Sequence, residues 1–335
     1  MKKNVLVTGA AGFIGSFVAD ELVRRGLNVV ALDDLSGGFR ENVPPRAHFV
    51  KGSVTDKRLV EKLFRRYKFR YVYHLAAYAA EGLSHFIKRF NYENNLIGSV
   101  NLINASVNHQ VECFVFTSSI AVYGKNQLPM KENMTPLPED SYGIAKLAVE
   151  EELKVSKEMF GLDYVIFRPH NVYGERQNIG DKYRNVIGIF MNQILKGEPL
   201  SIFGSGRQTR AFTYIEDVAP VIARAALTPK AYGQVFNIGA DKSYSVNDLA
   251  GKVARAMGRP GHPVIHHDAR NEVAHAYSSH SKVRQYFSCK PAYSLDDGLE
   301  KMAAWVRSHG SKKSADFKNI EIMKNLPRSW RKSSK

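Results

Sequence analysis

A glycine-rich loop near the start of the chain limits its possible folds more than any other feature. The apolar run at 5–8 leads into TGAAGFIG, with glycines at positions 9, 12 and 15, and a helical stretch follows. Such glycines permit a tight turn, let the backbone approach a pyrophosphate, and bring the helix against the strand. The spacing is GxxGxxG rather than GxGxxG. Because the loop follows a strand and opens a helix, we predict a dinucleotide site here.

An acidic residue refines this prediction. The second apolar run, VVALD, ends at Asp33. A carboxylate at the end of that strand accepts hydrogen bonds from a ribose diol and repels a 2′-phosphate. The sequence therefore predicts NAD rather than NADP as the cofactor.

Short apolar runs alternate with amphipathic helical stretches through the first half of the chain. This alternation is typical of a doubly wound (Rossmann) parallel sheet with helices on both faces, which is the α/β class. The rhythm breaks up near residue 174 and shorter elements follow, so we expect a smaller C-terminal α/β domain there. We expect strands at 5–8, 29–33, 48–52, 71–77, 113–119 and 164–169. We expect an NAD-binding domain at 1–173 with 213–240 packing back on it, a substrate domain at 174–212 and 241–310, and a basic tail at 311–335.

Composition excludes several classes of protein. The 335 residues are 44% hydrophobic and 24% charged, as in a globular protein with a core. No run approaches the roughly 18 apolar residues of a membrane span. The two cysteines, Cys113 and Cys289, form no metal or disulfide pattern, so we expect no metal and a reducing cytoplasmic location. The net charge of +16 raises nucleic acid as a partner, but no recognition signature accompanies it, so we expect no specific nucleic-acid binding.

A tyrosine and a lysine stand four residues apart in SYGIAK. Tyr142 and Lys146 share one face of a predicted helix, where the ammonium would neighbour the phenol. By itself this spacing means little, because Tyr286 and Lys290 repeat it. Only the context of the first pair, which includes the glycine loop and a strand-end hydroxyl at Ser119, distinguishes the two.

Further motifs supply that context. The chain resembles the extended short-chain dehydrogenase/reductases and, within them, the NAD-dependent nucleotide-sugar epimerases, with the UDP-glucose 4-epimerase branch the most similar. The resemblance runs from about residue 4 to 305. It rests on GAAGFIG (9–15), HLAA (74–77), NNLIGS (94–99), TSSIAVYG (117–124), SYGIAK (141–146), RPHNVYG (168–174) and QTRAFTYIEDV (208–218).

The resemblance implies a role for each member of the tyrosine group. Tyr142 would be the catalytic acid/base, Lys146 would hold the nicotinamide ribose, and Ser119 would orient the substrate hydroxyl. A free tyrosine, with a pKa near 10, is a poor base at neutral pH. A fixed ammonium and an oxidised nicotinamide both favour the phenolate, so we expect them to lower this pKa.

The remaining cofactor residues follow from the same resemblance. The acid that usually contacts adenine is replaced by Ser53, and His170 stands near the expected nicotinamide position. The implied NAD-binding set is Gly9, Gly12, Phe13, Ile14, Gly15, Asp33, Ser53, Val54, Leu75, Ala76, Ala77, Asn95, Thr117, Tyr142, Lys146 and His170.

The family's substrate positions also map onto this chain. The diphosphate would be held by Asn171, Arg210 and Arg270, since guanidinium forks match phosphate oxygens. Tyr277 matches a position where a bulky residue disfavours N-acetylated sugars, whereas Arg184 could bind a C6 carboxylate. The uridine would lie near Asn185, Val186, Ile202 and Phe203, and the sugar near Ser119 and Tyr142.

The expected reaction is NAD-dependent C4 epimerisation of UDP-glucose and UDP-galactose through a 4-keto sugar. Dehydratase-like and decarboxylase-like relatives carry acids where this chain has Ile120 and Ala121, so extra proton chemistry is disfavoured. UDP-glucuronate or UDP-N-acetylglucosamine epimerisation stays open, as does another dehydratase or reductase. A non-catalytic NAD-sensing protein is a further alternative. The resemblance also implies a homodimer through helices near 91–109 and 141–160.

Overall fold

The structure, a computed structural model, describes residues 3–125, 127–269, 273–314, 316–327 and 330. Its centre is a seven-stranded sheet in the order β11-β6-β5-β4-β1-β2-β3, and every neighbouring pair is parallel. The predicted doubly wound α/β fold is thus confirmed. The strands are β1 (Asn4–Thr8), β2 (Asn28–Asp33), β3 (His48–Lys51), β4 (Tyr71–His74), β5 (Cys113–Thr117), β6 (Asp163–Pro169) and β11 (Gln234–Ile238).

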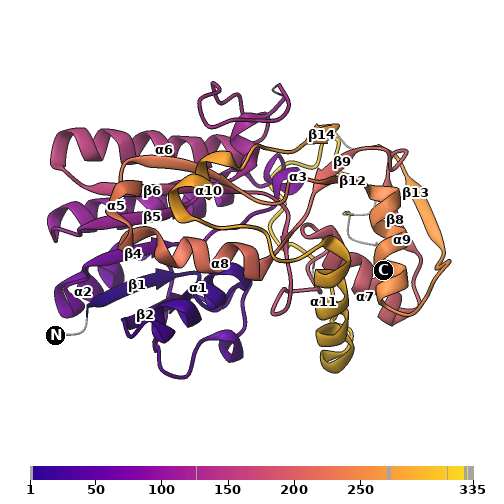
Figure 1. Ribbon diagram of the computed structural model, residues 1–335, viewed down its shortest axis with the longest axis horizontal. Helices are drawn as coiled ribbons and strands as arrows, with labels where there is room; N and C mark the ends of the chain where they lie inside the picture. Colours follow the sequence, from indigo (N-terminus) through magenta and orange to yellow (C-terminus); the bar gives the residue numbers. More distant parts are fainter. Residues whose placement is uncertain (1–2, 126, 270–272, 315, 328–329, 331–335) are drawn as a thin grey trace.

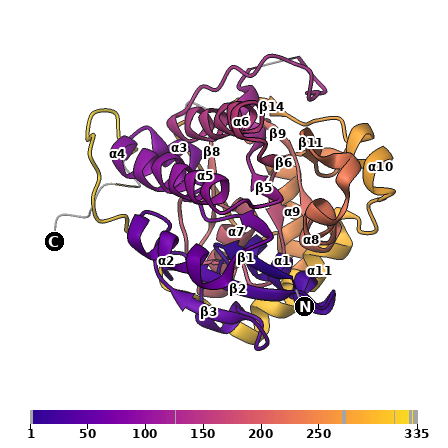
Figure 2. The same cartoon turned by 90° about the vertical axis from the view of Figure 1, so that its left-hand side faces the viewer.

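Helices cover both faces of this sheet, as Figures 1 and 2 show. The central strands carry apolar residues on both faces, because each face packs against helices and neither meets water. One face packs against α1 and α8, and the other against α2, α5 and α6. These helices span α1 (Phe13–Arg24), α2 (Lys57–Tyr67), α5 (Gly98–Asn108), α6 (Ser141–Phe160) and α8 (Ile215–Arg224).

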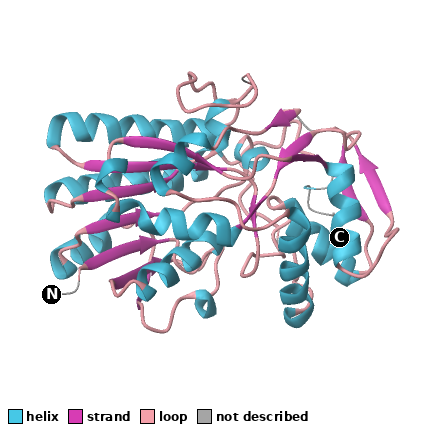
Figure 3. Cartoon of the chain, in the orientation of Figure 1, coloured by secondary structure: helices cyan, strands magenta, loops and turns pink. Residues whose placement is uncertain are grey.

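A smaller lobe lies beside the carboxyl ends of the strands (Figure 3). In the described residues it contains three helices and two small sheets, and its apolar residues join the core around α1 and α8. The chain reaches this lobe after β6, returns to complete the large sheet with β11, and then leaves again. The elements are α7 (Val186–Lys196), α9 (Val246–Ala256), α11 (Leu295–His309), β8 (Leu200–Phe203), β9 (Thr209–Ala211), β12 (Ser243–Ser245), β13 (Val264–His267) and β14 (His275–Ala276).

Short elements connect the two parts of the molecule. Two short helices, α3 (Glu81–Ser84) and α4 (Lys88–Tyr92), follow β4 and lie beside α6. In the described residues, no helix is long and apolar enough to cross a membrane. The other short elements are the π-helical turn Glu93–Ile97, β7 (Val172–Tyr173), β10 (Thr213–Tyr214) and α10 (Ser281–Phe287).

The start of α6 is fixed by its own sequence. Asp140 has extended backbone angles, and its side chain accepts a hydrogen bond from the Gly143 amide at 2.9 Å, which is a regular helix N-cap. The helix ends at Gly161, whose φ of 74° suits a left-handed cap. Tyr142 therefore occupies the first turn, and Lys146 follows one turn later on the same face.

Candidate active site

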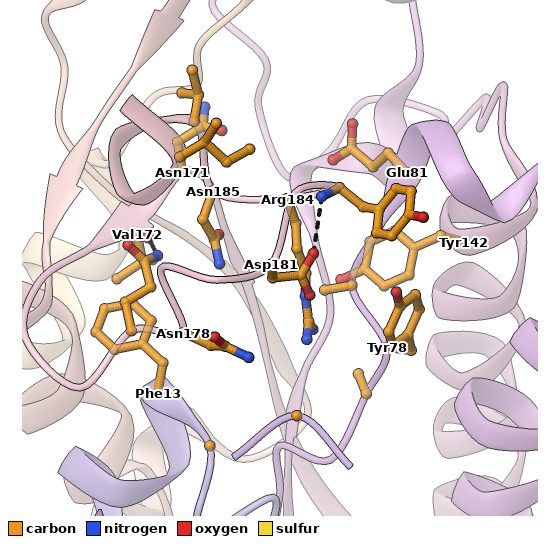
Figure 4. Close-up of a pocket in the computed structure, with 18 of the residues that line it drawn as sticks. Phe13, Tyr78, Glu81, Tyr142, Asn171, Val172, Asn178, Asp181, Arg184 and Asn185 are labelled. Atoms are coloured by element: carbon orange, nitrogen blue, oxygen red, sulfur yellow. Dashed lines mark hydrogen bonds and ion pairs between the residues drawn. The ribbon is translucent and has the colours of Figure 1, made fainter. Parts of the chain in front are cut away.

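A cavity of about 750 Å³ lies between the two lobes. It extends from the glycine loop, past the first turn of α6, to strands β8 and β9 of the small lobe. Figure 4 shows side chains from both lobes pointing into it, with Tyr142 and Tyr78 on one side and Asn178 and Asn185 on the other. Ligands of open α/β sheets bind in such a crevice, outside the carboxyl ends of the strands.

Two glycines of the glycine loop leave no room for a side chain. Gly9 has φ of +68°, and a Cβ atom there would lie 2.7 Å from the Ala76 amide nitrogen. A Cβ atom on Gly15 would lie 2.0 Å from the Gly9 carbonyl oxygen. Only glycine permits this approach of strand, loop and helix. The loop therefore forms a cradle at the N-terminus of α1 that suits a pyrophosphate.

Two polar groups suit the rest of a dinucleotide. Asp33 ends β2, and its oxygens accept hydrogen bonds from the amides of Ala11 (3.0 Å) and Leu35 (2.8 Å). Burial raises the pKa of this carboxyl, and the backbone hydrogen bonds act in the opposite direction. The Thr117 hydroxyl, which lies at the cavity, is buried without a hydrogen-bond partner among the described residues. A ribose diol could bond to the first group and a ribose hydroxyl to the second, so these residues fit NAD.

The reactive phenol lies where this cofactor site meets the sugar side. The Tyr142 hydroxyl lies beside Ser119, which stands just beyond the end of β5, and this serine acts to lower the pKa of the phenol. Ser119 also accepts a hydrogen bond from the Ala121 amide at 3.1 Å. The Tyr142 amide donates to Ser84 at 3.2 Å, which ties α6 to α3. Helix and strand therefore hold the two hydroxyls together.

Lys146 is held below the tyrosine. Its ammonium donates to the Thr117 carbonyl at 2.8 Å and lies 4.6 Å from the centre of the Phe116 ring. Burial lowers the pKa of Lys146 to about 7. Burial also raises the pKa of Tyr142, and the charge of Glu81 adds to this effect. The lowered tyrosine pKa that we expected is thus not found for the protein groups alone, because burial outweighs Ser119 and Arg184, the two neighbours that lower it.

On the sugar side of the cavity, Arg184 already has a carboxylate partner, Asp181, although we expected it to be able to bind a C6 carboxylate of the substrate. Its Nε atom donates to an Asp181 carboxylate oxygen at 2.6 Å (Figure 4). Its guanidinium lies 4.8 Å from the centre of the Tyr78 ring. Arg184 is therefore a paired cation, stacked on an aromatic ring, on the side of the cavity that holds Tyr142.

The far end of the cavity is formed by the small lobe. Asn171 and Asn185 line it, both with positive φ, and the Asn171 amide donates to the Ala211 carbonyl at 3.0 Å. Arg210 also lines the cavity, and its Nη1 atom donates to the Ala274 carbonyl at 3.0 Å. Amide and guanidinium donors gathered in this way suit an anionic diphosphate.

The structure brings most of the expected residues to this one cavity, with four exceptions. Asn95 lies behind the wall, where it exchanges hydrogen bonds with the Tyr78 backbone. His170 stacks on His280 with ring centres 5.4 Å apart, away from the lining. Tyr277 also lies off the lining, and Arg270 is outside the described residues. The members on the lining are Gly9, Gly12, Phe13, Ile14, Gly15, Asp33, Ser53, Val54, Leu75, Ala76, Ala77, Thr117, Ser119, Tyr142, Lys146, Asn171, Arg184, Asn185, Val186, Ile202, Phe203 and Arg210.

Sequence reasoning did not assign several lining residues. Asn178 and Asp181 come from the loop before α7, and Trp330 comes from the far C-terminus. No motif marks them, since they meet only through the fold. The comparison pair behaved as expected: Tyr286 packs on Phe236, and neither it nor Lys290 lines the cavity.

Comparisons with known proteins agree with this geometry. Residues 5–239 match the NAD dependent epimerase/dehydratase family. A putative UDP-glucose 4-epimerase of Methanocaldococcus jannaschii is 35% identical over 91% of this chain and 99% of its own length. The Thermotoga maritima UDP-glucose 4-epimerase with UDP-glucose has a TM-score of 0.86 at 34% identity, covering 91% of this chain and 99% of its own. A UDP-N-acetylglucosamine 4-epimerase of Methanobrevibacter ruminantium has a TM-score of 0.85 at 33% identity, covering 92% and 100%.

Proposed function

The chain belongs to the NAD dependent epimerase/dehydratase family, and from this premise we propose that it interconverts UDP-glucose and UDP-galactose by inverting C4 of the hexose. The observation that carries the proposal is the meeting of Tyr142, Ser119 and Lys146 with the glycine cradle in one cavity. A protein that only senses NAD has no need of all three side chains. The cofactor is NAD, which when bound accepts and returns a hydride.

The protein residues handle the proton and the orientation of the sugar. Ser119 positions the C4 hydroxyl, and Tyr142 takes its proton as the C4–H bond breaks. Tyr142 returns the proton after the 4-keto sugar has turned its other face. Since burial raises the pKa of Tyr142, the phenolate needs a positive charge close by. Ile120 and Ala121 offer no further acid or base, which favours simple epimerisation over dehydration.

The charges around the sugar favour a neutral hexose. A C6 carboxylate would compete with Asp181 for Arg184 and would also meet Glu81, whose charge acts on Tyr142. UDP-glucuronate is therefore disfavoured. The C2 substituent is a different matter, because Tyr277 lies off the cavity lining and so supplies no barrier to an N-acetyl group. UDP-N-acetylglucosamine is accordingly the second candidate substrate.

We also propose a homodimer formed through α5 and α6. Along α6 and on the turn before α5, large apolar side chains face solvent. An exposed group of this kind is typical of a protein–protein interface. Its members are Ile97, Ile144, Val155, Met159 and Phe160, of which Met159 and Phe160 are 68% and 64% exposed.

Product analysis tests the proposed reaction. Purified protein is incubated separately with UDP-glucose, UDP-N-acetylglucosamine and UDP-glucuronate, without added NAD, and the products are resolved by NMR. We expect the C4 epimer of UDP-glucose. Tyr142→Phe should lower the rate by at least about 100-fold, the scale of a lost general acid/base. No product from any of the three sugars, even with NAD added, would refute the proposal.

A further inference from the structure

The described residues 311–314, 316–327 and 330 follow α11, and we call them the strap. The strap leaves the small lobe and runs alongside α4 of the large lobe, as the yellow segment in Figure 2 shows. The Methanocaldococcus jannaschii relative matches 91% of this chain with 99% of its own length, so part of this chain has no counterpart in it. The family resemblance in the sequence runs from about residue 4 to 305, so we assign the strap to that unmatched part.

The first half of the strap is attached to the small lobe. The Lys312 backbone and the Asn192 side-chain amide on α7 exchange two hydrogen bonds, of 2.9 and 3.0 Å. Asp316 forms an ion pair with Lys182. The Phe317 amide donates to the Tyr183 hydroxyl at 3.0 Å. These contacts fix the strap to α7 and to the loop before it.

The second half is attached to the large lobe. The carboxylate of Glu321 accepts hydrogen bonds from the amides of Arg89 (2.8 Å) and Phe90 (2.9 Å), which lie in the first turn of α4. The Glu321 amide donates to the Phe86 carbonyl at 2.9 Å. Because amides at a helix start lack partners within the helix, a carboxylate there is a strong anchor. The strap thus joins the two lobes across the cavity.

Aromatic rings complete the attachment. Phe317 lies between Tyr78 (5.5 Å between ring centres) and Phe90 (5.0 Å). Trp330 packs against Tyr183 at 5.2 Å and is 4% exposed. Tyr78, Tyr183 and Trp330 all line the cavity that holds Tyr142. The wall of the sugar site therefore contains strap residues and residues that the strap holds.

The loop at 181–184 explains how the strap acts on the site. Its members divide between the two sides: Asp181 and Arg184 pair with each other beside Tyr78, and Lys182 and Tyr183 bind the strap. On the other lobe, Ser84 of α3 binds the Tyr142 amide at 3.2 Å. Leu83, next to Ser84 on α3, belongs to one apolar cluster with Leu326 and Trp330 of the strap. The strap therefore packs behind both walls that flank the phenol.

From this arrangement we propose that the strap belongs to the active site and that Phe317 and Trp330 are positioning residues for the sugar. They hold Tyr78 and Tyr183 against the cavity, so that the oxidised sugar can turn without leaving. The inference rests on the proposed epimerase function. When C4 is oxidised, its hydride passes to NAD and its hydroxyl proton to Tyr142. A 4-keto sugar that escapes leaves both behind, so the cofactor stays reduced and that molecule is inactive.

The experiment compares the full-length protein with Phe317→Leu, Trp330→Ala, Trp330→Phe and a chain ending at residue 310. Met323→Ala serves as the matched control, because Met323 is a strap residue that is 58% exposed. For each protein, kcat and KM for UDP-glucose, the affinity for UDP alone and the fluorescence of reduced cofactor during turnover are measured. The single variants keep the test decisive if the shortened chain fails to fold.

We expect Trp330→Ala and Phe317→Leu to raise KM for UDP-glucose by at least about tenfold, the scale of a lost aromatic pair in a packed site. Reduced cofactor should accumulate in these variants in proportion to turnover, while the affinity for UDP stays unchanged. Trp330→Phe should keep KM for UDP-glucose close to that of the full-length protein, because an aromatic ring is retained. Met323→Ala should match the full-length protein in every measurement. Unchanged KM and no accumulation in all variants would overturn the proposal. If the full-length protein forms no epimer, the proposed function fails instead.

Discussion

The two ends of the cavity are built in different ways. At the nucleotide end, the walls are backbone: a glycine cradle, a strand end and amides bound to Asp33. At the sugar end, the walls are side chains from segments far apart in the sequence, among them Tyr78, Arg184 and Trp330. Where the walls are backbone, almost no substitution fits without moving the main chain. Where the walls are side chains, substitutions can alter which ligand binds while the fold stays the same.

The largest effect should follow from one methyl group at the nucleotide end. In Gly15→Ala, the new Cβ atom would lie 2.0 Å from the Gly9 carbonyl oxygen, so the cradle must open. We expect NAD affinity to fall by about 100-fold, the scale of a displacement of about 1 Å in a binding group. The measurement is the NAD content of purified protein together with titration. Gly251→Ala on α9, where the nearest atom is 3.6 Å away, is the control. Full NAD retention in Gly15→Ala would contradict this account of the cradle.

Two buried histidines extend the comparison to stability. His74, behind the nucleotide end, bonds to Thr8 (2.7 Å) and Ser99 (2.8 Å), whereas both ring nitrogens of His170 lack partners among the described residues. Burial lowers the pKa of each to about 3. Between pH 6.5 and 3 the unfolded chain binds protons that the folded chain does not. As the pH decreases through this range, the free energy of unfolding should therefore fall by about 1.4 kcal/mol per pH unit for each histidine.

Substitution separates these two residues. Denaturant unfolding at pH 7.5 and 5.5 is the measurement. We expect His74→Leu to lose about 2 kcal/mol at pH 7.5, because two buried hydroxyls lose their partner. His170→Leu should be close to neutral at pH 7.5 and more stable than the parent at pH 5.5. If both substitutions lowered the free energy of unfolding equally at pH 7.5, the hydrogen bonds of His74 would not explain the difference between the two histidines.

A smaller effect should come from the ribose site. Asp33→Ser removes the charge that repels a 2′-phosphate and weakens the acceptor for the diol. We expect the preference for NAD over NADP to narrow by about tenfold, as for one charge-assisted hydrogen bond. Binding of both cofactors by calorimetry is the measurement. A loss of affinity that is equal for the two cofactors would show that Asp33 only supports the loop through Ala11 and Leu35.

The smallest effect concerns selectivity at the sugar end. Asp181→Asn removes the charge that pairs with Arg184, so a C6 carboxylate becomes more acceptable. We expect kcat/KM for UDP-glucuronate relative to UDP-glucose to rise about twofold to fivefold, as for a partly exposed ion pair. Asp20→Asn is the matched control, because Asp20 pairs with Arg176 of the same loop at 2.6 Å, away from the cavity lining. If the ratio of kcat/KM for the two sugars changed equally in both variants, Asp181 would have no specific role in selectivity.

The same difference explains what the sequence could predict. The parallel sheet and the glycine loop were predictable, since buried strands read as apolar runs and the cradle needs glycine at fixed spacing. Tyr142 and Lys146 were recognisable once their context was included. Asp181, Asn178 and Trp330 were not, because contacts between distant segments leave no local pattern. The strap looked like a basic tail, and its apolar residues (Phe317, Ile320, Leu326 and Trp330) follow neither helical nor strand periodicity.

Strand β11 has a consequence for how the protein is made. It is the edge strand beside β6, yet 64 residues of chain, most of them in the small lobe, separate the end of β6 at Pro169 from the start of β11 at Gln234. During synthesis, the large sheet therefore cannot be completed until Ile238 has left the ribosome. A nascent chain stalled before that point would expose the hydrogen-bonding edge of β6. Because the chain enters the small lobe, returns to form β11 and leaves again, no single cut in the gene would separate the two lobes.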